Sequence, residues 1–138
     1  QGATGYNMGI SHLLNYSIKG TYPDLEIDYP AVHFTRGKLA LPQHVELKLE
    51  ASNLKLSWNT ELHQTNSFAD DRVEILIYGP KWNIYYEVPG GLIRNQGVTE
   101  FVLPSSFTGD IVHVYVYLLT RDGKKWSDSL YVGMVQVG

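Results

Sequence analysis

Hydrophobic and polar residues alternate along most of the chain from residue 44 onward. Val45, Leu47 and Leu49 alternate with charged residues, and the alternation resumes at Leu54 after a short polar turn. A period of two is typical of a β-strand with one face buried and one face in water. Trp58 ends the second such segment, and we expect it in the core. The pattern predicts seven strands, over 45–50, 54–58, 73–77, 83–88, 99–103, 110–120 and 130–137.

The first 43 residues show a different pattern. Apolar residues recur at spacings of three and four over 8–19, and a glycine follows at position 20, which predicts a short amphipathic helix. Residues 25–29 alternate between apolar and acidic, as in an extended segment. This part of the chain has too few apolar residues for a core of its own. We therefore expect residues 1–43, an N-terminal helix and extended arm, to pack on a sandwich formed by residues 44–138.

Seven short strands without interleaved helices favour an antiparallel β-sandwich over an α/β fold. Trp58 in the second strand, Leu-Pro at 103–104 and the run V-H-V-Y-V-Y-L-L-T-R-D-G-K-K-W-S-D-S resemble the fibronectin type III pattern. The resemblance covers residues 44–138 and implies an all-β, seven-stranded fibronectin III/Ig-like sandwich, without implying a function. Where that pattern usually has a Tyr, this chain has Phe107 or Ile111, so we expect the tyrosine-corner hydrogen bond to be missing.

A second resemblance spans nearly the whole chain. It rests on I-K-G-T-Y-P-D-L-E-I-D-Y from residue 18, R-G-K-L from residue 36 and the ending that begins F-T-G-D-I-V at residue 107. These runs are similar to an uncharacterised bacterial family of unknown function. Its members typically carry a further glycine-rich, basic N-terminal section that resembles segments of phage-type structural proteins. Together with the start at Gln1 rather than Met, the resemblance implies the C-terminal part of a longer product. It implies no activity, cofactor or catalytic residue.

Composition and charge exclude several classes of function. The 138 residues include no cysteine, which removes disulfides, thiolate metal sites and cysteine nucleophiles. Eleven Lys and Arg against fourteen Asp and Glu give a net charge of −3, so no basic excess is available for nucleic acid. No apolar run approaches the roughly 18 residues that a membrane helix needs. We expect no nucleic-acid partner and no membrane span. The sequence leaves the cellular location open, and it favours an extracellular or assembly-associated one.

The search for catalytic chemistry finds no supporting motif. The five histidines, at positions 12, 33, 44, 63 and 113, lack the spacing of a metal site. Neither a G-x-S-x-G nucleophile turn nor a glycine-rich phosphate loop occurs. The acidic pair Asp70-Asp71 is more typical of a solvated loop than of a calcium site. We expect no catalytic residue, no metal, no cofactor and no enzymatic activity.

Aromatic residues are the strongest indication of binding, since the chain has ten Tyr and three Trp. His113, Tyr115 and Tyr117 share one face of the sixth strand, opposite a valine face that we assign to the core. The candidate binding residues are Tyr115, Tyr117, His113, Trp82, Tyr85 and Tyr86. Such a surface would stack on sugar rings or anchor a protein partner. Alternatively, both faces of the sixth strand are covered, one by the opposing sheet and one by the N-terminal helix.

Three classes of function remain. The leading one is a non-enzymatic structural or protein-interaction module, as the C-terminal part of a longer protein and a subunit of a surface or phage-like assembly. Its partner would be another protein or a second copy of this chain. The alternative is a secreted carbohydrate-recognition module that uses exposed aromatics. An enzyme, the third class, needs a pocket with convergent acids or histidines.

Overall fold

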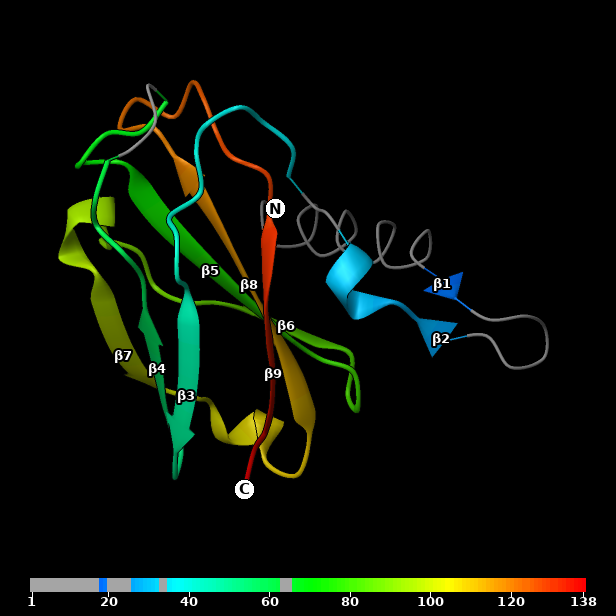
Figure 1. The fold of residues 1–138 in the computed structure, drawn as a ribbon. Coiled ribbons are helices and arrows are strands. Elements are labelled where there is room, and N and C mark those ends of the chain that lie inside the picture. The colour runs from blue at the N-terminus through cyan, green and yellow to red at the C-terminus, as the bar shows by residue number, and fades with distance from the viewer. Residues whose placement is uncertain (1–17, 20–25, 33–34, 63–65) are drawn as a thin grey trace.

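Residues 46–136 fold into two antiparallel sheets packed face to face (Figure 1). The structure is a computed structural model that describes residues 18–19, 26–32, 35–62 and 66–138. One sheet has the order β3-β4-β7, formed by β3 (Glu46–Glu50), β4 (Asn53–Ser57) and β7 (Val98–Val102). The other has the order β6-β5-β8-β9, formed by β6 (Ile84–Glu87), β5 (Arg72–Gly79), β8 (Ile111–Leu119) and β9 (Leu130–Gln136). The predicted β-sandwich is confirmed, and each of its seven strands ends within two residues of the expected position.

The core lies between the two sheets. Leu54 and Leu56 enter it from β4, and Val112, Val114 and Val116 enter it from β8, all of them buried. The alternation read from the sequence therefore places the valine face of β8 inward, as expected. Trp58 is also buried in this cluster, which confirms its assignment to the core.

Short 3-10 turns connect the strands. They are η2 (Arg94–Gln96), between β6 and β7, and η3 (Ser105–Phe107), before β8. Phe107 in η3 is fully buried in the core. A phenyl ring has no hydroxyl group, so this side chain cannot make the tyrosine-corner hydrogen bond.

The N-terminal region differs from the prediction. Most of the expected helix, residues 8–17, lies outside the described residues, but its last two residues form strand β1 (Ile18–Lys19). The helix prediction is wrong there, because this backbone pairs antiparallel with β2 (Glu26–Ile27). The pair projects away from the sandwich (Figure 1). After β2, the 3-10 turn η1 (Tyr29–Ala31) brings the chain onto the β6-β5-β8-β9 sheet. Within the described part of the chain, no helix is long and apolar enough to cross a membrane.

Candidate functional site

The turn η1 covers the aromatic face of β8. The ring of Tyr29 stacks on that of His113, with centroids 3.6 Å apart and planes 14° apart. The Tyr115 hydroxyl donates a hydrogen bond to the carbonyl oxygen of Tyr29 at 2.9 Å. His113 and Tyr115 are consequently buried, and Tyr117 is half-buried. At His113 and Tyr115 the strand is therefore buried on both faces, whereas the alternative expectation named the N-terminal helix as the cover. The cover described here is η1, and most of the helix expected in that role lies outside the described residues.

The structure separates the other candidate aromatic residues. Tyr85 joins the covered layer by stacking on Tyr78, with centroids 4.9 Å apart. Tyr86 faces the core and meets Phe107 edge-on at 6.3 Å. Trp82 lies in the turn between β5 and β6, 64% exposed. The six candidates therefore do not form one exposed aromatic surface, because His113, Tyr115 and Tyr85 belong to the layer that includes Tyr29, and Tyr86 packs against the core.

Burial sets the protonation state of the covered layer. It lowers the pKa of His113 to about 4, against a smaller opposing effect of the Asp110 carboxylate. It raises the pKa of Tyr78 and of Tyr117 to about 12, with nearby phenol and carboxylate groups adding to the increase. His113 and these phenols are therefore neutral near pH 7. The Nδ1 atom of His113 lies 2.9 Å from the Tyr131 hydroxyl oxygen, a hydrogen bond that ties β8 to β9.

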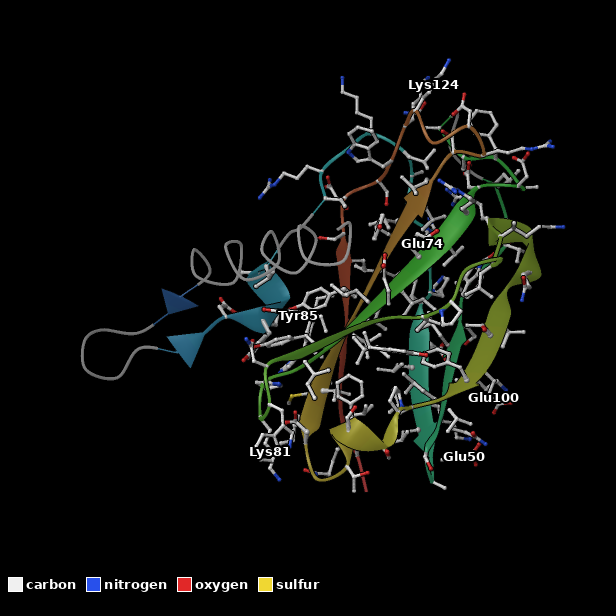
Figure 2. All side chains as sticks on the ribbon, turned by 180° about the vertical axis from the view of Figure 1, so that it is seen from behind. Glu50, Glu74, Lys81, Tyr85, Glu100 and Lys124 are labelled. Carbon is white, nitrogen blue, oxygen red and sulfur yellow. The ribbon has the colours of Figure 1, made fainter. Side chains whose placement is uncertain are left out.

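A groove opens at one end of the sandwich, where three segments distant in the sequence meet. It has a volume of about 470 Å³. Its lining comes from residues 36–39, from Asn66 and Phe68, and from residues 124–126. Figure 2 shows Lys124 at this end, while Lys81 and Glu50 lie at the opposite end. We call this feature the loop-end groove.

Hydrogen bonds pin the first of these segments in place. The Trp126 indole Nε1–H donates to the Arg36 carbonyl oxygen at 2.6 Å, and the Leu39 amide donates to the Trp126 carbonyl oxygen at 3.1 Å. A side chain at Gly37 would bring its Cβ to 1.9 Å from the Trp126 carbonyl oxygen, so only glycine fits this approach. Residues 36–39 are thus held rigidly along the edge of Trp126.

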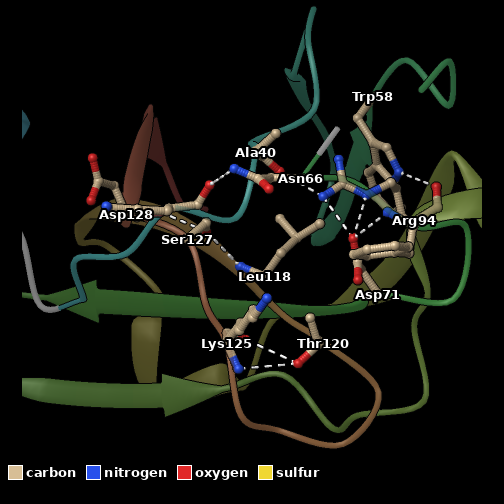
Figure 3. Close-up of polar contacts among 12 residues, drawn as sticks. Ala40, Trp58, Asn66, Asp71, Arg94, Leu118, Thr120, Lys125, Ser127 and Asp128 are labelled. Atoms are coloured by element: carbon tan, nitrogen blue, oxygen red, sulfur yellow. Dashed lines mark hydrogen bonds and ion pairs between the residues drawn. The ribbon is translucent and has the colours of Figure 1, made fainter. Parts of the chain in front are cut away.

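A buried ion pair holds the second segment (Figure 3). The Nε and Nη2 atoms of Arg94 each lie 2.9 Å from Oδ2 of Asp71, and the two side chains are 2% and 0% exposed. Arg94 Nη2 also donates to the carbonyl oxygen of Ala40. The Phe68 amide donates to the same Asp71 oxygen at 2.8 Å, and the Trp58 indole donates to the Arg94 carbonyl oxygen at 2.7 Å. Arg94 therefore ties together the N-terminal arm, the β4–β5 loop and η2.

Sequence reasoning missed this ion pair. It assigned Asp70-Asp71 to a solvated loop, which suits the exposed Asp70 but is wrong for the buried Asp71. The two partners are 23 residues apart, and no spacing rule connects them. The available signal was the position of Asp71 directly before the apolar strand β5.

The loop-end groove combines positive charge with exposed aromatic surface. Four cationic side chains line it, those of Arg36, Lys38, Lys124 and Lys125, and no acid is among its described lining residues. Phe68 and Trp126 contribute apolar surface and are 49% and 43% exposed. A neighbouring hollow of about 590 Å³ shares Phe68, Lys124 and Lys125, and its further lining includes Arg121 and the acids Asp70, Asp71 and Asp122. Within the described ranges, no group of three or more His, Asp or Glu gathers to hold a metal ion.

The fold and the groove together define the class of protein: an all-β sandwich with a basic and aromatic groove among the loops at one end. Residues 1–133 match a family described as "Family of unknown function (DUF6266)", and the chain belongs to that family. This confirms the expected membership of an uncharacterised domain family. No curated protein and no solved structure matches the chain.

Proposed function

We propose that this protein is a non-enzymatic protein-interaction module that binds its partner through the loop-end groove. One observation carries the proposal: three loop segments distant in sequence are cross-linked by hydrogen bonds around two half-exposed aromatic side chains, Phe68 and Trp126. Loops on a rigid sandwich are a frequent place for binding residues. Because these loops are already ordered, binding would cost little conformational entropy.

A non-enzymatic role agrees with the contacts of two buried titratable groups, Asp71 and His113. Asp71 is paired with Arg94, and His113 is stacked under Tyr29 with its pKa lowered by burial. These contacts hold the structure together, and none of these side chains is among the described lining residues of the loop-end groove. A subunit of a surface or phage-like assembly is one setting for such a module, with a neighbouring subunit or a second copy as the partner.

Carbohydrate recognition is the second candidate, and Trp82 favours it. Its ring is 64% exposed, with Lys81 Nζ 5.6 Å from its centroid. A single exposed ring offers less stacking area than the extended surface that the sequence predicted. The protein-interaction role therefore has the stronger support.

Site-specific photo-crosslinking tests the proposed function. A benzophenone amino acid replaces Phe68 or Trp126 in cells that produce the protein, and Trp82 and Val102 serve as exposed control positions. We expect a discrete protein adduct from positions 68 and 126 and not from the controls. Adducts at twice the chain mass would identify a second copy as the partner. The proposal is wrong if the loop-end positions yield no protein adduct, or if glycan binding is found that Trp82→Ala abolishes.

A further inference from the structure

Positive charge gathers in the loop-end groove, and no acid is among its described lining residues. Four of the chain's eleven Lys and Arg residues line this groove, although the whole chain carries a net charge of −3. The described ion pairs, Lys48–Glu50, Arg94–Asp71 and Arg121–Asp70, include none of those four side chains. Clustered cations that make no ion pair with the described residues and share a concave surface raise the local concentration of anionic ligands.

Nearby acids are already engaged with the backbone. Asp128 Oδ1 accepts a hydrogen bond from the Gly37 amide at 3.0 Å. Asp122 Oδ1 accepts one from the Lys124 amide at 3.0 Å and another from the Thr120 hydroxyl at 2.7 Å, and these bonds lower the pKa of Asp122. Both carboxylates stabilise the loops that form the groove. Lys124 also lowers the pKa of Asp122 through its charge, so that carboxylate partly offsets one of the four cations. Neither Asp122 nor Asp128 lines the groove, whose described lining has four cations and no acid, so the groove presents net positive charge to a ligand.

The apolar part of the groove distinguishes between anionic ligands. Trp126 has its indole N–H bound to the Arg36 carbonyl oxygen, so the ring offers a face but no free donor. One of the two N–H groups of the Asn66 side-chain amide is also used, in a hydrogen bond to the Lys38 carbonyl oxygen at 3.2 Å. A sugar needs several placed hydrogen-bonding groups as well as a stacking ring. A large apolar side chain needs only the exposed surface of Phe68 and Trp126.

We propose that the loop-end groove binds an acidic, extended segment of a partner protein, with carboxylates beside its four cations and one large apolar side chain against Phe68 and Trp126. This inference rests on the proposed function and specifies the chemistry of the partner. The lysines and Arg36 would steer the segment toward the groove, and the aromatic pair would fix its position.

The three tryptophans provide a direct readout, because each lies in a different environment. Trp126 is in the groove, Trp58 is in the core and Trp82 is in the exposed β5–β6 turn. Their indole N–H signals in a ¹⁵N–¹H spectrum are assigned by single Trp→Phe variants. The probe is an acetylated and amidated pentapeptide of four glutamates around a central phenylalanine. We expect it to shift the Trp126 signal saturably, and to leave those of Trp58 and Trp82 in place.

Charge variants test the role of the cations. Lys124→Gln with Lys125→Gln should weaken binding of the peptide by about two- to thirtyfold, if each exposed charge contributes as such pairs usually do. The matched control is Lys48→Gln with Lys55→Gln, which removes the same charge from the exposed face of β3 and β4. The control should bind as the native chain does. Added salt should weaken binding of the native chain more than that of the groove variant.

Several results would contradict the inference. A glutamine or lysine version of the peptide that binds equally well would show that charge does not select the ligand. The peptide could leave the Trp126 signal in place while protein adducts still form at positions 68 and 126. That result would overturn the acidic-segment inference and leave the proposed function standing. Oligogalacturonate that shifts Trp126 where the peptide does not would identify an anionic saccharide as the ligand instead.

Discussion

Replacing Arg94 by methionine removes the guanidinium group that joins three segments at the loop end. In the native chain, Oδ2 of Asp71 accepts hydrogen bonds from Arg94 and from the Phe68 amide, while Oδ1 makes no hydrogen bond with the described residues. Arg94→Met would leave this fully buried carboxylate with one donor and would deprive the Ala40 carbonyl oxygen of its donor. Removing one member of a buried ion pair typically costs about 3–5 kcal/mol of unfolding free energy.

Urea unfolding measures this loss. With a urea dependence of about 2 kcal/mol per molar, a loss of about 4 kcal/mol lowers the midpoint by about 2 M. A chain of 138 residues has a stability of roughly 7–20 kcal/mol, so the variant should still fold. The matched control is Arg121→Met, which removes an ion pair to Asp70 of 3.8 Å whose side chains are 84% and 54% exposed. That change should cost less than about 0.5 kcal/mol.

A double-mutant cycle separates the ion pair from the loss of packing. Asp71→Leu combined with Arg94→Met removes both charges, so it should be less destabilising than the sum of the two single changes. We expect the difference to exceed about 2 kcal/mol, since each single change strands a buried charge. Additive losses of unfolding free energy in the double variant would contradict a stabilising role of the Arg94–Asp71 pair at the loop end. An Arg94→Met variant as stable as Arg121→Met would contradict it as well.

Three further predictions concern the core, the groove and the covered aromatic layer. Trp58→Ala should lower the unfolding free energy by about 3–5 kcal/mol, measured by urea unfolding, and a nearly unperturbed variant would contradict its place in the core. Gly37→Ala should displace the loop that crosses Trp126 and shift the Trp126 indole N–H signal, whereas Gly90→Ala, where a Cβ meets nothing within 4 Å, should leave that signal unchanged. Because the pKa of His113 falls from 6.5 to about 4 on folding, the unfolded chain binds more protons between these values. The stability that His113 contributes is therefore present above pH 6.5 and is lost as the pH falls toward 4. The His113→Gln variant should lose less stability over this range, and equal losses in both proteins would contradict the assignment.

The sequence by itself determined where the seven strands lie and which of their faces point into the core. Alternation of apolar and polar residues is a local property, so it located the seven strands, the inward valines of β8 and the buried Trp58. It also indicated family membership, which covers residues 1–133. It did not reveal whether the aromatic face of β8 is open or covered, because an exposed and a covered strand face can share the same pattern.

Tertiary structure decided the rest, because the decisive contacts join residues far apart in the sequence. The bond from Tyr115 to Tyr29 spans 86 residues, the bond from Trp126 to Arg36 spans 90, and the Arg94–Asp71 pair spans 23. No periodicity encodes such contacts, since they depend on how the sheets pack and where each connecting loop returns. His113 and Tyr115 of β8 thus lie in a covered layer, and the loop-end groove is formed by residues that no local pattern joins.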